Sequence, residues 1–80
     1  MDIESIQHLL KSNVPDSDVT VTGDGHHFEA YVISPVFEGM SLIQRQRMIN
    51  AIVGKHLLDG TIHALSVKAK TPFEWQREKK

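Results

Sequence analysis

The first apolar residues of the chain recur at the spacing of one helix face. They are Ile3, Ile6, Leu9 and Leu10. This spacing predicts a short amphipathic helix over residues 2–12, with acidic residues near its start and a lysine near its end, where each complements the helix dipole. Residues 13–18 contain a proline and several short polar side chains, which favour a turn.

The next two segments alternate between apolar and polar residues and are rich in β-branched side chains. Residues 19–22 and 28–34 are therefore predicted to be strands. The connection over residues 23–27 is short and contains two glycines, which is typical of a β-hairpin. The side chains expected to face the core are Val19, Val21, Phe28, Ala30 and Val32.

A second helix is predicted after residues 35–40 leave the sheet. Ser41 and Gln44 have the spacing of a capping box, and the helix is expected to end near Lys55 and His56. Its apolar stripe should comprise Leu42, Ile43, Met48, Ile49, Ile52 and Val53. Its polar face should hold Gln44, Arg45, Arg47 and Asn50.

The last predicted strand covers residues 60–69 and runs directly into a final helix. Alternation puts His63 on one face with Leu65, Val67 and Ala69, and puts Ile62, Ala64, Ser66 and Lys68 on the other. Thr71, Pro72 and Glu74 have the spacing of a helix N-cap, first position and capping partner. We expect Trp75 to pack this helix on the sheet, and residues 76–80 to fray.

These elements predict the order α-β-β-α-β-α in one domain over residues 1–80. A whole helix separates the second strand from the third, so their connection predicts a crossover and a parallel pairing, whereas the hairpin is antiparallel. The expected fold class is therefore α+β, with a three-stranded mixed sheet and helices packed on one face.

The amino-acid composition excludes several classes of function and leaves the predicted fold class unchanged. The 80 residues include ten acidic and nine basic side chains, so overall charge does not favour nucleic-acid binding, and the absence of cysteine excludes disulfides and thiolate ligands from this chain. No apolar run approaches the about 20 residues of a membrane span, and no basic leader precedes an apolar segment. We expect a soluble, unprocessed, cytoplasmic protein.

Histidine is the residue type best suited to carry chemistry here, because no nucleophile–base pair or carboxylate dyad suggests an enzyme. A histidine on an apolar strand face, such as His63, is ordinarily a hydrogen-bonded core residue. His26 and His27 occupy the hairpin connection, and adjacent strand residues face opposite ways, so one of them at most should reach a given metal ion. His8 and His56 lie on helices without partners at metal-ligand spacing, and are expected at the surface.

Three blocks of sequence together resemble the BolA family over nearly the whole chain. They are Phe37-Glu38-Gly39-Met40 followed by Gln44-Arg45-Gln46-Arg47, then Ile62-His63-Ala64-Leu65-Ser66-Val67-Lys68-Ala69, then Thr71-Pro72-Phe73-Glu74-Trp75. The resemblance implies a fold similar to a class II KH domain. It also implies a cytosolic partner, a monothiol glutaredoxin of the Cys-Gly-Phe-Ser type, with a [2Fe-2S] cluster bridging the two proteins.

In the arrangement that the resemblance implies, the glutaredoxin cysteine and glutathione supply thiolates and the BolA-like chain supplies histidine. His63 matches the family's ligand histidine. Many members offer a second ligand from the loop between the first two strands, where this chain has His26 and His27 in a shorter loop; His26 is the more loop-like of the two. The Arg-His pair that is usual in the family's second helix appears here as Arg45-Gln46-Arg47, without histidine.

Basic side chains are the second candidate site. They are Arg45, Arg47, Lys55, Lys68 and Lys70. They could meet glutathione carboxylates, the partner's surface or nucleic-acid phosphates, although for Arg45 a solvated helix face is the simpler interpretation.

Two functions follow from these observations. The first is an adaptor in iron–sulfur cluster trafficking, iron sensing or acid-stress response. The second is a KH-like nucleic-acid-binding transcriptional regulator, in which Arg45, Arg47, Lys68 and Lys70 contact phosphates. Residues 38–41 do not form the Gly-x-x-Gly loop with which KH domains clamp a backbone.

Overall fold

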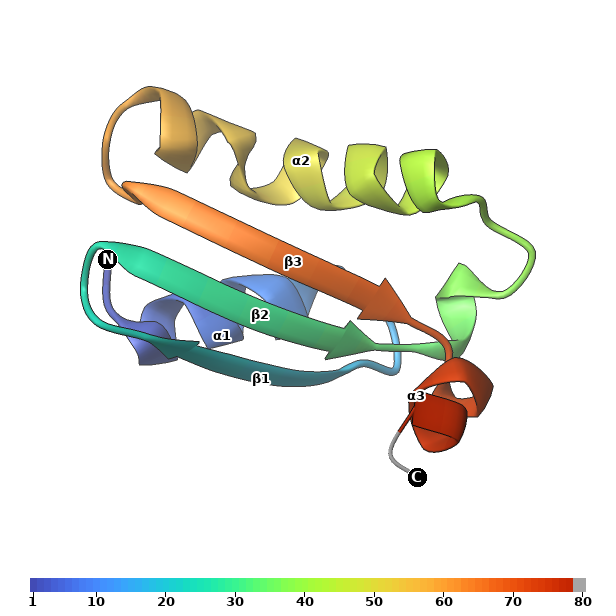
Figure 1. Cartoon of the computed structure of the whole chain (residues 1–80). Coiled ribbons are helices and arrows are strands. Elements are labelled where there is room, and N and C mark those ends of the chain that lie inside the picture. The colour runs from blue at the N-terminus through green and yellow to red at the C-terminus, as the bar shows by residue number, and fades with distance from the viewer. Residues whose placement is uncertain (79–80) are drawn as a thin grey trace.

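The computed structural model describes residues 1–78 and has the predicted order of elements (Figure 1). In chain order these are α1 (Ile3–Asn13), β1 (Asp18–Gly23), β2 (His27–Ile33), a 3₁₀ turn η1 (Pro35–Phe37), α2 (Leu42–Leu58), β3 (Ala64–Lys70) and α3 (Pro72–Glu78). Residues 76–78, expected in a fraying tail, belong to α3, and residues 79–80 lie outside the described residues. None of the described helices is both long and apolar enough to cross a membrane.

The strands form one mixed sheet in the order β1-β2-β3. β1 pairs antiparallel with β2, so that Val19 lies opposite Val32, and β2 pairs parallel with β3, so that Phe28 lies opposite Leu65. α2 provides the crossover between the two parallel strands (Figure 1). Both predicted strand pairings are confirmed.

The core lies between one face of this sheet and the two longer helices. Its buried apolar side chains are Ile6, Leu10, Val14, Val19, Val21, Phe28, Ala30, Val32, Phe37, Ile49, Val53 and Ile62. All five side chains predicted to face inward from β1 and β2 are among them. Thr20, Thr22 and Glu29, on the other face, are exposed.

The start of α2 is closed as predicted, and four of the six residues of its predicted apolar stripe lie in the core or pack against it. Gln44 N–H donates to Ser41 Oγ at 3.2 Å, and Ser41 N–H donates to Gln44 Oε1 at 2.8 Å. The buried side chains of α2 are Arg45, Ile49 and Val53, spaced four residues apart. This orientation puts Ile43 on the opposite side, where it is 64% exposed, and Leu42 in the first turn is 78% exposed. Both were wrongly assigned to the apolar stripe.

Arg45 is not on a solvated polar face, contrary to expectation, but is 7% exposed and joins four segments. Its Nε donates to Met40 O at 3.1 Å, and its Nη1 donates to Ala69 O at 3.1 Å. Nη1 and Nη2 donate to the two carboxylate oxygens of Glu74 at 2.7 and 3.1 Å. The guanidinium also lies 5.8 Å from the centre of the Phe37 ring. Arg45 therefore fastens α2 to η1, to the end of β3 and to α3.

α3 lies at the end of the sheet where β3 stops (Figure 1). Glu74 N–H donates to Thr71 Oγ1 at 3.2 Å and Thr71 N–H donates to Glu74 Oε1 at 2.9 Å, which confirms the predicted cap. The ring of Trp75 lies 5.5 Å from that of Tyr31, on the sheet face opposite the core. Trp75 thus packs α3 on the sheet, as predicted.

Candidate metal centre

The loop between β1 and β2 is held by one carboxylate. Asp24 Oδ1 accepts hydrogen bonds from the backbone N–H groups of His27 and His26, both at 2.9 Å, and these bonds lower the pKa of Asp24 below its usual value. Asp24 N–H in turn donates to His27 O at 3.2 Å. Gly25 has a φ of 98°, a conformation that glycine adopts without strain. The backbone that carries His26 is therefore fixed, although its side chain is exposed.

The segment before β3 is fixed by its connection to α2. Ile62 N–H donates to His56 O at 2.9 Å, and the Ile62 side chain is fully buried. β3 begins only at Ala64, so strand alternation does not extend back to residue 60 as predicted. Ile62, rather than His63, points into the core, and His63 is exposed. The expectation that His63 shares the inward face of Leu65 is wrong for this reason.

These two loops bring His26 and His63 together. Their ring centroids are 5.4 Å apart, and the ring planes are inclined at 42°. His27 begins β2 opposite Ala64, which is the first residue of β3. Because His27 and Ala64 are in register, the residues just before them emerge side by side from neighbouring strand ends. Two of the three histidines predicted as metal ligands thus lie together, and His27 occupies the adjoining strand position.

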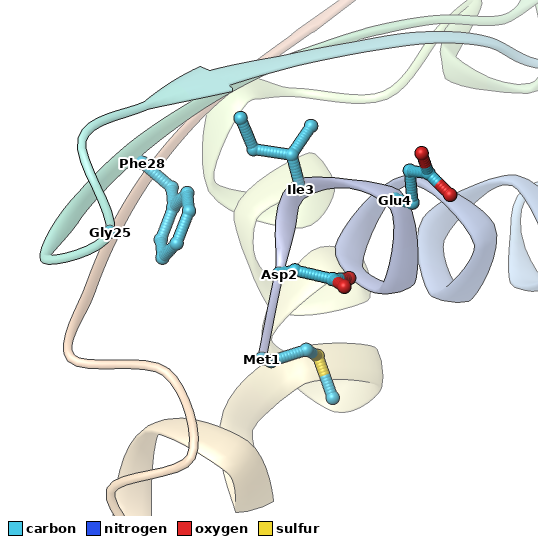
Figure 2. A pocket seen from close by; sticks show the side chains of 6 residues that line it. All are labelled: Met1, Asp2, Ile3, Glu4, Gly25 and Phe28. Atoms are coloured by element: carbon cyan, nitrogen blue, oxygen red, sulfur yellow. The ribbon is translucent and has the colours of Figure 1, made fainter.

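A groove adjoins this end of the molecule, between the hairpin loop and the start of α1 (Figure 2). It is lined by Met1, Asp2, Ile3, Glu4, Gly25 and Phe28. Figure 2 shows the Phe28 ring on one side and Ile3 on the other, with the carboxylates of Asp2 and Glu4 turned away from Phe28. Asp2 caps α1 by accepting from Ser5 N–H at 2.8 Å. On the hairpin side the groove is lined by Gly25 and Phe28, and neither carries a side chain that binds metal.

Within residues 1–78, no three His, Asp, Glu or Cys side chains converge on one metal position. His26 and His63 form a pair of imidazole donors, which suit iron, zinc, copper and nickel. A four-coordinate ion at this pair would take its remaining ligands from outside the described part of the chain. This pair of imidazoles is the most specific chemical feature that the predicted residues form.

The comparison with known proteins decides the family. The family model described as BolA-like protein matches residues 2–74. The chain belongs to the BolA family. The predicted family membership and the BolA-like fold are both confirmed.

Relatives of this BolA protein span its full length. It is 36% identical to the acid stress protein IbaG of Escherichia coli (strain K12) over 80 residues, which cover 100% of this chain and 95% of the relative. A bolA protein homologue from Coxiella burnetii has a TM-score of 0.82 at 38% identity, over 95% of this chain and 97% of that one. A bol-like protein from Babesia bovis has a TM-score of 0.80 at 30% identity, over 100% and 95%.

Two of the basic side chains of this BolA protein are bonded within the molecule. Arg45 is buried, and all three of its guanidinium nitrogens are bonded inside the molecule. Lys70 forms an ion pair with Glu78. Arg47, Lys55 and Lys68 remain exposed. Two of the four residues expected to contact a partner or nucleic acid are therefore already engaged within the fold.

His56 was expected at the surface and is instead half-buried. Its Nδ1 has no hydrogen-bond partner within residues 1–78, and its carbonyl oxygen holds the segment that leads to His63. The signal in the sequence was its position three residues after Val53, which places it near the buried face of α2. His8 is exposed as predicted.

Proposed function

We propose that this BolA protein is a non-enzymatic adaptor that binds a monothiol glutaredoxin of the Cys-Gly-Phe-Ser type and shares a bridging [2Fe-2S] cluster with it. The observation that supports the proposal is the pair formed by His26 and His63, two exposed imidazoles whose ring centroids lie 5.4 Å apart. The role that follows is cytoplasmic cluster trafficking, iron sensing or acid-stress response.

The donor set fits this kind of group. Imidazoles replace two thiolates on one iron of Rieske [2Fe-2S] centres, so a protein without cysteine can still hold a cluster iron. In this proposal His63 is the principal ligand, His26 is the second, and the partner cysteine and glutathione supply thiolates. When bound, the cluster provides iron and sulfide for transfer, or a redox centre for sensing.

This chain's own residues position the imidazoles. The buried Ile62 anchors the backbone beside His63, and the Asp24 carboxylate fixes the loop that carries His26. The parallel register between β2 and β3 sets the separation of the two loops. The two backbone segments that carry the ligands are thus held in place before any partner arrives, which reduces the entropy lost on binding.

The test is reconstitution with the partner. Purified protein is mixed with a Cys-Gly-Phe-Ser glutaredoxin, glutathione, iron and sulfide, and visible absorption and circular dichroism are recorded. We expect the native chain to give a cluster spectrum distinct from that of the glutaredoxin homodimer. His63→Ala should abolish this difference, His26→Ala should reduce it, and the neighbouring His27→Ala serves as the matched control and should leave it in place. A native spectrum identical to that of the homodimer would refute the adaptor.

The nucleic-acid regulator is the weaker alternative. Arg45 and Lys70, two of its four expected phosphate contacts, are bonded to Glu74 and Glu78. It requires a steep fall of DNA or RNA affinity with salt, and a smaller salt slope in Arg47→Ala.

A further inference from the structure

β3 is an edge strand of the sheet. β2 pairs with one side of it in an unbroken register from Ala64 to Lys70, and no strand of residues 1–78 pairs with the other side (Figure 1). The strand contains no proline, and no bulge interrupts its pairing. It therefore lacks two of the devices that usually block the addition of a further strand.

The hydrogen bonds at the end of β3 show which backbone groups are free. Lys70 O accepts from Ser34 N–H at 2.9 Å, so the polar groups of Lys70 face β2. Residues of a parallel strand alternate between facing the partner strand and facing away, so those of Leu65, Val67 and Ala69 face outward. Independently, Ala69 O accepts from Arg45 Nη1, which approaches from outside the sheet. With Ala69 O occupied, the open stretch runs from Leu65 to Val67.

A groove follows this open stretch. It is lined by Glu29, Gln46, Leu65, Ser66, Val67 and Lys68. Gln46 belongs to α2, where its Nε2 donates to Asn50 Oδ1 at 3.0 Å. Lys68 lies opposite Tyr31 in the register, on the sheet face away from the core. Lys68 is exposed and makes no ion pair within the described residues. Glu29 lies one strand further from the edge, so the charge nearest the edge is positive.

We propose that the free edge of β3 binds an extended acidic peptide segment of another protein, which adds to the sheet as a fourth strand. The outward N–H and C=O groups of Leu65 and Val67 pair with a peptide backbone, which supplies donors and acceptors at the same repeat. Lys68 favours a carboxylate on the facing side chain of the peptide. This site is separate from the histidine pair and goes beyond the adaptor function.

Amide exchange on the native protein provides the test. The probe is the peptide acetyl-Thr-Glu-Val-Glu-Val-Glu-Thr-amide, added to ¹⁵N-labelled protein. In the free protein, the amides of Leu65 and Val67 should exchange fast, while those of Ser66 and Lys68, which face β2, exchange slowly. At saturating peptide, exchange at Leu65 and Val67 should slow by at least about tenfold, and Ser66 and Lys68 should not change.

Three controls separate backbone pairing from other contacts. The same peptide with N-methyl groups on alternate amides cannot form the ladder and should not bind. Lys68→Glu should raise the dissociation constant of the peptide by about tenfold, which corresponds to the loss of about 1.4 kcal/mol of binding free energy. Val67→Pro removes an outward N–H, which an edge strand tolerates, and should abolish binding. The first two controls test the proposal even if Val67→Pro fails to fold.

Other occupants of the edge give different results, and each would overturn the proposal. Protection of Leu65 and Val67 that rises with protein concentration alone would show a second copy. Equal or stronger protection by single-stranded oligothymidine would show nucleic acid. Unchanged exchange at saturating peptide concentration, or equal binding of the N-methylated peptide, would show that the edge does not add a strand. His63→Ala should bind the peptide like the native chain, so failure of the adaptor function and failure of this site are distinguishable.

Discussion

Among single residues, Arg45 makes the most varied set of contacts described. The guanidinium is buried, yet each of its nitrogens has an acceptor: two backbone carbonyls and the Glu74 carboxylate. Its flat, forked shape matches these acceptors in a way that a lysine ammonium cannot. Arg47, two residues along the same helix, is exposed.

We expect Arg45→Ala to lower the free energy of unfolding by about 2–4 kcal/mol, because it leaves Met40 O and Ala69 O without a donor and Glu74 without its pair. Arg47→Ala is the matched control and should change the free energy by less than about 0.5 kcal/mol. Urea unfolding followed by circular dichroism measures both. Equal effects of the two substitutions would contradict the role assigned to Arg45.

The Arg45 bond also predicts how stability depends on pH. It lowers the pKa of Glu74 from 4.5 to about 2 in the folded chain. A carboxyl with a depressed folded pKa stabilises the fold fully above its unfolded pKa, so this contribution should be lost as the pH falls from about 4.5 to about 2. The Glu74 side chain is 40% exposed, so solvent screening limits the loss to about 1–2 kcal/mol.

Urea unfolding at several pH values between 7 and 2 checks this dependence. Glu74→Gln keeps the size of the side chain but removes the titrating group, so its stability should fall less over the same interval. A native chain and a Glu74→Gln variant with parallel pH profiles would show that the pair does not contribute.

Among the elements, the β1–β2 hairpin has the strictest local requirement. A Cβ on Gly23 would lie 2.6 Å from His27 O and 2.6 Å from Phe28 Cδ1, and the first of these is a backbone atom. In contrast, a Cβ on Gly54 within α2 would have no neighbour within 4 Å. The two glycines therefore have different reasons to be present.

Gly23→Ala should destabilise the protein by about 1–3 kcal/mol, because the hairpin has to shift to relieve the contact. Gly54→Ala should stabilise it by about 0.5–1 kcal/mol, since alanine is the better helix former and nothing obstructs its methyl group. Thermal unfolding of both variants gives the comparison. The amide chemical shifts of His26 and His27 should change in Gly23→Ala and stay the same in Gly54→Ala. Unchanged shifts in Gly23→Ala would exclude a displaced hairpin.

The elements could be predicted from sequence where their signals are local. The caps of α2 and α3 and the alternation in β1 and β2 involve residues close together in the chain, and these predictions are confirmed. The start of β3 could not be predicted in this way, because the buried Ile62 is held by a backbone hydrogen bond to His56, a residue distant from the strand pattern. The contact of His26 with His63 depends on a parallel register that no periodicity specifies; only the family resemblance pointed to it.

In the whole molecule, the histidine pair and the Arg45 cluster occupy opposite ends of the sheet. His26 and His63 precede the first residues of β2 and β3, whereas Arg45 and Glu74 gather where β3 ends (Figure 1). The strands between them form a continuous packed layer. The Arg45–Glu74 pair and the proposed metal ligands are thus different residues at opposite ends of the sheet.

This separation predicts additivity. Glu74→Gln and Gly23→Ala act at opposite ends, so the loss of unfolding free energy in the double variant should equal the sum of the single losses to within about 0.5 kcal/mol. At a pH where it is folded, Glu74→Gln should also give the cluster spectrum of the native chain. A double variant that departs from the sum would show that the two ends are coupled through the sheet.

The crossover through α2 has a consequence for folding. His26 and His63 become neighbours only when β3 docks beside β2. This docking closes a chain loop that contains all of α2, and closing so long a loop costs conformational entropy. The hairpin, by comparison, joins neighbouring residues and can form early. During synthesis the ribosome releases His26 well before His63, so a nascent or partly folded chain presents isolated histidines. The paired imidazoles appear only with the completed fold, so in the proposed adaptor an unfinished molecule lacks the paired ligand set.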